Sequence, residues 1–282
     1  MKTRLIDGKK MADEMLDDVR EQVSGLPRAP RLAVVLVGDN PASLVYVKNK
    51  VKASQRAGIR TDVYRLSPVL TQDALEAFIN DLNADGDIDG ILLQLPLPAH
   101  LNADAAIERI APDKDVDGLT THNLGRLMVG APNLAPCTPL ACLHLIKKAC
   151  PKLAGKNAVI VGRSRLVGRP LGQLLLAHDC TVVQAHSHTK NLAQVCARAD
   201  ILVAAAGHAR LIGRRHVKRG AVVIDVGINR VGDRLVGDVN RAAVTGVARA
   251  VTPVPGGVGP MTIAMLMYNT LRACRRGEAK SA

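Results

Sequence analysis

Strand-like and helix-like patterns alternate along the chain, and this alternation restricts its fold more than any other feature. Residues 32–37 (Leu-Ala-Val-Val-Leu-Val) form an unbroken apolar run, typical of a strand buried on both faces of a parallel sheet. Asn40 and Pro41 then supply a helix cap and a first-turn proline, and Gly58 is placed to end that helix. A first βαβαβ block is completed by a strand over 62–66, a helix over 73–82 and a strand over 88–95.

A second α/β block follows an irregular stretch and opens with a helix capped at Thr138-Pro139. Residues 229–236 carry Gly232-Asp233 at their centre and are interpreted as a hairpin. The last helix, after Pro260, is expected to return to the first block. The sequence therefore predicts two α/β domains, the second Rossmann-like with a parallel sheet, divided as 1–138 plus 261–282 and 139–260. The second block's strands are expected over 158–161, 180–184, 201–205 and 221–226, and its helices up to 177 and over 191–198.

The chain ends and the cysteines indicate an intracellular protein without a membrane span. No apolar run approaches the roughly 18 residues that a membrane helix needs. The N-terminus lacks the apolar core of a signal peptide, and its acidic residues are unlike a transit peptide, so a cytoplasmic location is expected. The six cysteines form no C-x-x-C pair and are interpreted as reduced and mostly buried. Cys137, Cys142 and His144 match no common zinc spacing, so no metal site is expected.

The formal net charge of +13 suits either nucleic acid or a small acidic ligand. Aromatic residues make up only 1% of the chain, too few for a base-stacking platform. The one dense basic run, residues 210–219, is interpreted as a solvated surface. A small acidic ligand is therefore favoured, and a nucleic-acid partner is not expected.

Residues 252–262 (Thr-Pro-Val-Pro-Gly-Gly-Val-Gly-Pro-Met-Thr) contain three prolines and three glycines and no charge. Proline fixes φ, whereas glycine permits shapes and close approaches that a Cβ forbids. Such a loop can lay its backbone against a flat ligand. On its own, it is equally well a tight connection from a strand into a helix.

A dinucleotide site is predicted where the second block begins. Gly162 and Gly168 flank a turn between a strand and a helix, the context in which backbone N–H groups bind phosphate, although the pattern is not G-x-G-x-x-G. After the next strand, NAD enzymes usually present a carboxylate to the ribose, but residues 184–190 (Gln-Ala-His-Ser-His-Thr-Lys) have none. NADP is therefore predicted over NAD, with Arg163, Ser164 and Ser187 near the phosphates.

The first block offers a candidate acid–base group. Tyr46 and Lys50 lie four residues apart on one helical face, with Ser43 one turn earlier. A lysine becomes an acid–base catalyst only when burial or a nearby positive charge lowers its pKa; otherwise the pair is an ordinary surface feature. Residues 113–118 (Asp-Lys-Asp-Val-Asp-Gly) imitate a calcium loop but place Leu124 at its last position, which excludes calcium. One of these carboxylates can instead hold an amidine-like ring edge.

Taken together, eight segments in order resemble the bifunctional methylenetetrahydrofolate dehydrogenase/methenyltetrahydrofolate cyclohydrolase family over nearly the whole chain. They are Ser43-x-x-Tyr46-x-x-x-Lys50, Asp89-Gly-Ile-Leu-Leu-Gln94-Leu-Pro, Lys114-Asp-Val-Asp117-Gly, Asn123-Leu-Gly-Arg-Leu, Pro136-Cys-Thr-Pro, Gly162-Arg-Ser-x-x-Val-Gly-x-Pro170, Val223-Ile-Asp-Val-Gly-Ile-Asn229 and the 252–262 loop.

The resemblance implies a function and a role for each matching position. It implies oxidation of 5,10-methylenetetrahydrofolate with NADP and hydrolysis of the methenyl product to 10-formyltetrahydrofolate, within one-carbon metabolism and purine biosynthesis. It also implies an active-site cleft between a folate-binding catalytic domain and an NADP-binding domain, and a homodimer acting on folates that can be polyglutamylated. The implied catalytic residues are Lys50, Tyr46, Gln94 and Asp117; the further folate contacts are Ser43, Leu95, Pro255, Gly256 and Gly259; the NADP contacts are Gly162, Arg163, Ser164, Ser187 and Ile228.

Two departures from the family pattern bear on these expectations. Leu119 stands where the family usually has phenylalanine, which is expected to thin the aromatic wall near the pterin. His188 replaces a frequent lysine beside the NADP contacts. A dehydrogenase without cyclohydrolase activity and a basic regulatory or nucleic-acid-binding protein are the alternative interpretations.

Overall fold

The structure is a computed structural model that describes residues 1–281, with side chains described up to Gly277. It divides into two compact units. Unit 1 contains Met1–Ala12 and Thr138–Thr262, and unit 2 contains Asp13–Cys137 and Ile263–Ala282. No helix in the described part of the chain combines the length and the apolar character that crossing a membrane requires.

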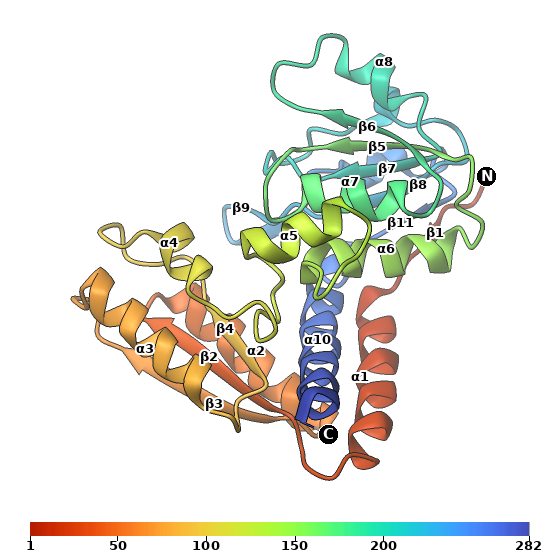
Figure 1. The fold of residues 1–282 in the computed structure, drawn as a ribbon. Helices are drawn as coiled ribbons and strands as arrows, with labels where there is room; N and C mark the ends of the chain where they lie inside the picture. Colours follow the sequence, from red (N-terminus) through yellow and green to blue (C-terminus); the bar gives the residue numbers. More distant parts are fainter. Residues whose placement is uncertain (282) are drawn as a thin grey trace. The chain divides into compact units, whose positions relative to one another are not determined.

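Unit 1 is built on a six-stranded sheet in the order β1-β11-β8-β7-β5-β6 (Figure 1). Every neighbouring pair is parallel, and helices α6 and α7 lie on one side with α8 on the other. The predicted Rossmann-like domain is therefore confirmed as a doubly covered parallel sheet. Its strands are β1 (Arg4–Leu5), β5 (Asn157–Val161), β6 (Thr181–Ala185), β7 (Ile201–Ala204), β8 (Val222–Asp225) and β11 (Ala250–Val251); its helices are α6 (Cys137–Ala149), α7 (Gly168–Leu176), α8 (Leu192–Cys196), the 3₁₀ turn η1 (Arg214–His216) and α9 (Arg241–Val244).

The predicted hairpin of unit 1 is also present. Strands β9 (Asn229–Val231) and β10 (Arg234–Val236) pair antiparallel. Gly232 adopts a φ of 58° at the turn, which explains the glycine there.

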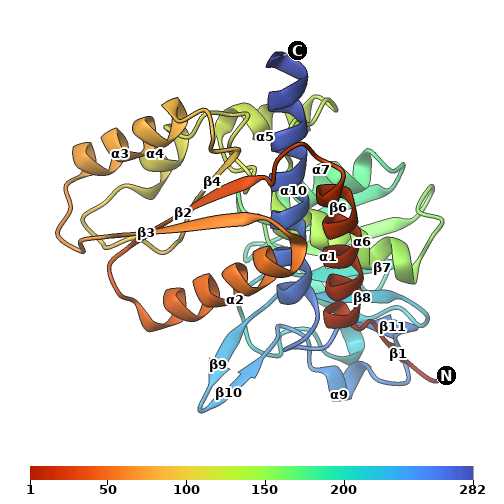
Figure 2. The same ribbon diagram turned by 90° about the horizontal axis from the view of Figure 1, so that it is seen from below.

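Unit 2 has a three-stranded parallel sheet in the order β3-β2-β4, with α2 on one face and α3 and α4 on the other (Figure 2). The central strand β2 is the apolar run of the sequence, and its residues 32–37 are buried. The strands are β2 (Arg31–Val37), β3 (Arg60–Leu66) and β4 (Gly90–Leu93), and the helices are α1 (Gly8–Ser24), α2 (Pro41–Ala57), α3 (Gln72–Ala84), α4 (Ala103–Glu108), α5 (Thr121–Met128) and α10 (Val258–Ser281); α1 and α10 each begin in unit 1.

The division differs from the sequence-based expectation at the N-terminus. We expected the first twelve residues to belong to the folate-binding domain, which corresponds to unit 2, but they belong to unit 1. Strand β1 pairs with β11, with Arg4 opposite Ala250, and the Ile6 N–H donates to the Val251 carbonyl at 2.9 Å. A two-residue strand has too short a pattern for periodicity to detect, which accounts for the difference.

Candidate active site

Lys50 and Gln94 meet in unit 2, from a helix and from the end of a buried strand. Asn40 caps α2 by accepting hydrogen bonds from the backbone N–H groups of Ala42 and Ser43, at 3.0 and 3.3 Å. Lys50 lies on this helix and donates from Nζ to Gln94 Oε1 at 2.8 Å. Gln94 follows β4 and is itself buried. The lysine amine is therefore held by a neutral acceptor.

Burial acts in opposite directions on Lys50 and on Asp117. It lowers the pKa of the Lys50 amine, although the charge of Asp117 raises it in part. Burial raises the pKa of the Asp117 carboxyl, and the charge of Lys50 opposes that change. Both groups are thus displaced toward their neutral forms. A lowered pKa increases the share of neutral lysine amine at a given pH, and the neutral amine is the form that accepts a proton in acid–base catalysis.

Cys137 is a site residue that the sequence interpretation did not include. Its thiol hydrogen-bonds with Asp117, and its Sγ lies 3.2 Å from the Val116 carbonyl oxygen. Burial, and then the charge of Asp117, raise the pKa of this thiol well above its ordinary value. The thiol therefore stays neutral and can donate a hydrogen bond. The Pro136-Cys-Thr-Pro motif was its only signal in the sequence.

Asp117 is positioned by a tightly packed turn. Gly118 adopts a φ of 69°, and a Cβ there would lie 2.5 Å from the backbone carbon of Ala135. Asn269, on α10, donates from Nδ2 to the carbonyls of Val116 and Ala135, both at 2.9 Å. Asn269 is buried, and no sequence pattern indicated its role. These contacts fix the backbone on each side of the Asp117 segment.

The neighbours of Asp117 in its motif serve the fold instead. Lys114 donates from Nζ to three carbonyls at the end of α3, those of Leu82, Asn83 and Asp85. Asp115 accepts from the backbone N–H groups of Leu119 and Thr120 and from Asn123 Nδ2. Asp117 is the carboxylate of the motif whose charge acts on Lys50. The family resemblance gives Asp117 the role of binding the pterin ring, which stays a prediction.

The other predicted folate contacts of unit 2 differ in exposure. Tyr46 lies on the same face of α2 as Lys50 and is 42% exposed, so its ring is open to a ligand. Ser43 is buried, and its hydroxyl has no hydrogen-bond partner among the described residues. Leu119 lies in the hydrophobic core with residues such as Val35 and Ile91. The expectation that Leu119 thins a wall beside the pterin stays a prediction.

Unit 1 contains a cavity of about 750 Å³ at the carboxyl ends of β5, β6 and β7. Gly162, Arg163, Ser164 and Ser187, four of the five predicted NADP contacts, line it together. The fifth, Ile228, lies outside this lining and is 49% exposed. The lining also includes His186, Thr189 and His208, which the sequence interpretation did not assign.

The turn between β5 and α7, at the edge of this cavity, lets a ligand approach the backbone closely. Gly162 has a φ of 131°, and a Cβ there would lie 2.1 Å from the carbonyl oxygen of Ala205. A Cβ on Gly168 would lie 2.2 Å from the Gly162 carbonyl oxygen. Ser164 Oγ accepts from the backbone N–H groups of Val167 and Gly168, at 3.1 and 3.4 Å, at the beginning of α7. This is the tight strand–turn–helix geometry that phosphate binding uses.

Two buried carboxylates of unit 1 bind backbone N–H groups, and one of them, Asp238, contacts the cavity lining. Asp238 Oδ2 accepts from the backbone N–H groups of Ala206 and Gly207, at 2.6 and 2.9 Å, and its Oδ1 accepts from Asn229 Nδ2 at 2.9 Å. Ala206 lines the cavity. Asp225 accepts from the N–H groups of Gly227, Asp238 and Val239. Burial raises the pKa of Asp225 to about 6 despite these donors.

The Pro-Gly loop continues into α10. Gly256 has a φ of 98°, and a Cβ on Gly257 would lie 2.4 Å from the Pro253 carbonyl oxygen. Gly8 packs against this loop so closely that a Cβ at Gly8 would lie 2.0 Å from the Gly257 carbonyl oxygen. The Lys9 N–H donates a hydrogen bond to the Gly256 carbonyl. The loop is thus fixed from the N-terminal segment. Its predicted folate contacts, Pro255, Gly256 and Gly259, belong to unit 1 and stay predictions.

No group of three or more potential metal ligands occurs among the described residues. The six cysteines are buried thiols.

Comparisons with known proteins agree with these features. The tetrahydrofolate dehydrogenase/cyclohydrolase catalytic domain matches residues 6–117, and the NAD(P)-binding domain of the same family matches residues 136–278. The bifunctional protein FolD of Sphingopyxis alaskensis is 54% identical, over 97% of this chain and 94% of that protein. The bifunctional FolD dehydrogenase/cyclohydrolase of Campylobacter jejuni superposes with a TM-score of 0.95 at 44% identity, covering 97% of this chain and 99% of that one.

The enzyme of Trypanosoma brucei, solved in complex with NADP cofactor and an inhibitor, superposes with a TM-score of 0.93 at 36% identity, covering 98% of each chain. Both units of the fold and both family domains are thus matched along one chain. The chain belongs to the tetrahydrofolate dehydrogenase/cyclohydrolase family.

Proposed function

We propose that the protein oxidises 5,10-methylenetetrahydrofolate to 5,10-methenyltetrahydrofolate with NADP and hydrolyses the methenyl product to 10-formyltetrahydrofolate. The contact of Lys50 with Gln94, beside the buried carboxyl of Asp117, carries this proposal. Lys50 supplies an amine that can accept a proton. Hydrolysis needs such a proton acceptor, whereas hydride transfer does not. The same contact favours a bifunctional enzyme over a dehydrogenase alone.

The unit 1 cavity fits NADP in shape and in charge. At Gly162 the backbone leaves no room for a Cβ, so a ligand can approach the main chain closely there. Among the described residues, the lining contains Arg163 but no Asp or Glu. When bound, NADP accepts the hydride that leaves the methylene carbon of the folate. Ser164 and Ser187 offer hydroxyl donors to phosphate oxygens, and Arg163 offers a guanidinium. Positioning is the main contribution of these residues to the oxidation.

Lys50 serves the second reaction. Water adds to the methenyl carbon while the neutral amine takes one of its protons, which forms a carbinol. The bond from this carbon to N5 then breaks, and a proton is delivered to N5. One proton of the water thus ends on N5 and the other is released to solvent. Gln94 keeps the amine in place without adding a charge.

Asp117 is proposed to hold the pterin edge through paired hydrogen bonds, with Cys137 supporting its carboxylate. Tyr46 packs on the folate, and Ser43, Leu95, Pro255, Gly256 and Gly259 complete its contacts. The basic net charge suits a folate that carries one or more glutamates. The direct test is the reduction of NADP on addition of 5,10-methylenetetrahydrofolate, with the loss of methenyltetrahydrofolate assayed separately. Absence of the first reaction would refute the proposal, and absence of the second alone would leave a monofunctional dehydrogenase.

Removing the charge of Asp117 is expected to move the pH profile of methenyl hydrolysis. Burial lowers the pKa of Lys50 and Asp117 raises it, so in Asp117→Asn burial acts with less opposition. The pKa of Lys50 then falls further, and the neutral amine persists to lower pH. The acidic limb of the kcat–pH profile should therefore shift to lower pH, at saturating folate. Asp87→Asn, at an exposed position of the same unit, should leave the limb in place. An unmoved or raised limb in Asp117→Asn would contradict this coupling.

A carboxylate placed at Ser187 is expected to weaken the use of NADP. The lining has no acid among the described residues, so Ser187→Asp would introduce repulsion toward a 2′-phosphate. We expect kcat/KM for NADP to fall by about 10-fold or more, because loss of a charge-assisted contact has at least this effect. The value for NAD should change little. Ser187→Ala, which removes only the hydroxyl, is the matched control and should have a smaller effect. Unchanged NADP kinetics in Ser187→Asp would place the phosphate elsewhere.

A homodimer in the cytoplasm is also proposed. The hairpin of unit 1 exposes Ile228, Val231 and Leu235, by 49, 49 and 44%. Such an apolar surface is suited to a second copy of the chain. Light scattering after size-exclusion chromatography checks the mass, and Leu235→Glu should shift it toward the monomer.

A further inference from the structure

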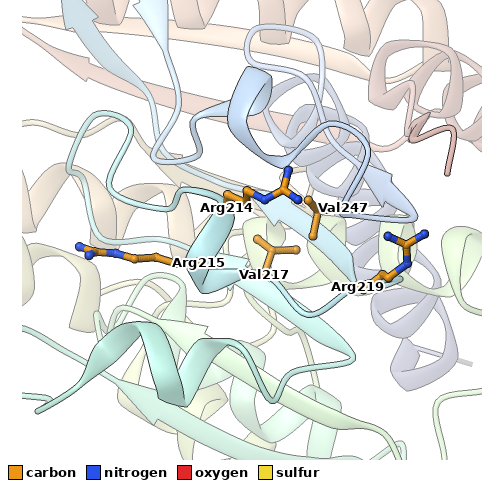
Figure 3. A pocket seen from close by; sticks show the side chains of 5 residues that line it. All are labelled: Arg214, Arg215, Val217, Arg219 and Val247. Atoms are coloured by element: carbon orange, nitrogen blue, oxygen red, sulfur yellow. The ribbon is translucent and has the colours of Figure 1, made fainter.

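A second cavity of unit 1, of about 490 Å³, shares no lining residue with the nucleotide cavity. It is lined by Arg214, Arg215, Val217, Arg219 and Val247, which we call the arginine pocket. The guanidinium groups of Arg214 and Arg219 flank the two valine side chains, and Arg215 extends away from them (Figure 3). The proposed oxidation and hydrolysis use none of these residues.

The walls of the arginine pocket are held by hydrogen bonds. Arg214 and Arg215 lie on the 3₁₀ turn η1, where the Gly213 N–H donates to His216 Nδ1 at 3.1 Å and the His216 N–H donates to the Gly213 carbonyl at 3.0 Å. Burial lowers the pKa of His216, which favours the neutral ring that can accept this bond. The Gly220 N–H donates to the Val247 carbonyl at 2.9 Å, which joins the two walls.

The positive charge of the arginine pocket is not compensated along the segments that form it. Residues 201–224 and 239–277 contain no Asp or Glu. Asp225, the nearest acid in sequence, is buried and accepts hydrogen bonds from backbone N–H groups. On the other side of the run, Asp200 is bound to Lys218 at 2.7 Å. Within the described residues, no ion pair involves Arg214, Arg215 or Arg219. Three exposed arginines therefore line a hollow without a carboxylate, which favours a ligand with several negative charges.

Val217 and Val247 favour a ligand that has an apolar part in addition to its negative charges. Val217 and Val247 are buried, so they present only a small apolar surface between the two flanking guanidiniums. Arginine presents a planar fork of donors that matches phosphate oxygens. An inorganic anion would leave the apolar surface unused, whereas a phosphorylated molecule with an apolar body would cover it. We propose that the arginine pocket binds an organic polyphosphate, with the phosphates held by Arg214 and Arg219 and the apolar body against Val217 and Val247.

The test is calorimetric titration of the full-length protein, saturated with NADP to occupy the other cavity, with ATP and with tripolyphosphate as probes. ATP should bind more tightly than tripolyphosphate, because only ATP has a body for the valines. Arg214→Ala and Arg219→Ala should each lower the affinity for ATP by about 10-fold or more, as expected for hydrogen bonds between charged groups. Arg20→Ala, at an exposed position of α1, is the matched control and should bind ATP like the parent protein.

A second variant separates the two halves of the proposal. Val247→Thr keeps the side-chain shape but adds a hydroxyl, so it should weaken ATP binding and leave tripolyphosphate binding unchanged. Equal affinity of the parent protein for the two probes would overturn the assignment of an organic ligand. Absence of ATP binding, or ATP binding that survives removal of Arg214 and Arg219, would overturn the site itself.

Discussion

Replacing Lys50 with methionine is expected to lower the rate of methenyltetrahydrofolate hydrolysis by about 10²- to 10⁴-fold, the usual contribution of a positioned acid–base group. Methionine keeps a long unbranched side chain but has no amine to take the proton of the attacking water. Gln94 Oε1 also loses the donor that it contacts at 2.8 Å. The dehydrogenase reaction should fall much less, because hydride transfer depends on placement rather than on proton transfer.

The measurement is kcat for each reaction, assayed separately with the same preparation. Lys48→Met provides the matched control, since Lys48 lies on the same helix α2 but is exposed. That variant should retain both activities. If Lys50→Met hydrolyses methenyltetrahydrofolate at the parental rate, Lys50 is not the acid–base group of this reaction.

Replacing Asp238 with alanine is expected both to destabilise unit 1 and to weaken NADP binding. The change leaves the partly buried N–H groups of Ala206 and Gly207 and the side-chain amide of Asn229 without their acceptor. Each unsatisfied donor costs about 1–3 kcal/mol. For a domain of this size, 1 kcal/mol lowers the melting temperature by roughly 2–4 °C. Because the three donors are only partly buried, the lower end of this cost applies to each, about 3 kcal/mol in total. A decrease of roughly 6–12 °C is therefore expected in thermal unfolding.

The effect on NADP follows from the position of Ala206 in the lining of the nucleotide cavity. Without Asp238 this backbone loses its anchor, so KM for NADP should rise. Asp238→Asn keeps one oxygen for the two backbone N–H groups and should lie between the parent and the alanine variant in both measurements. Asp233→Ala, at the exposed turn of the hairpin, is the control. If Asp238→Ala keeps the parental melting temperature and KM, the carboxylate does not hold the cavity.

Strong local patterns made much of the fold predictable. The buried strand β2 and its following helix α2 begin and end within one residue of the sequence-based expectation, because an unbroken apolar run, a cap, a proline and a glycine all coincide there. Strand β4 is shorter than expected, Gly90–Leu93 rather than 88–95, since the same apolar character continues into irregular backbone. Strands β1 and β11 were not predicted, because two residues carry no measurable period.

The residues of the candidate site could be predicted where reactive side chains are close together in the sequence. Contacts between residues that are far apart in the chain could not be predicted. Tyr46 and Lys50 share a helical face and can be found by counting residues. The contact of Lys50 with Gln94 and the support of the Asp117 segment by Asn269 join residues far apart in the chain, so no local pattern reveals them. Lys114 and Asp115 show the converse, since charged residues in a functional-looking motif bind backbone groups of the fold instead.

The interleaving of the two units affects how the protein can be made. Strand β1 emerges first from the ribosome, yet its partner β11 is among the last strands to be synthesised. Asn269, which holds the segment before Asp117, emerges later still. Neither unit can therefore complete its native contacts until nearly the whole polypeptide has been translated. A nonsense codon anywhere before β11 would leave both halves of the enzyme unfinished, with no independently active fragment.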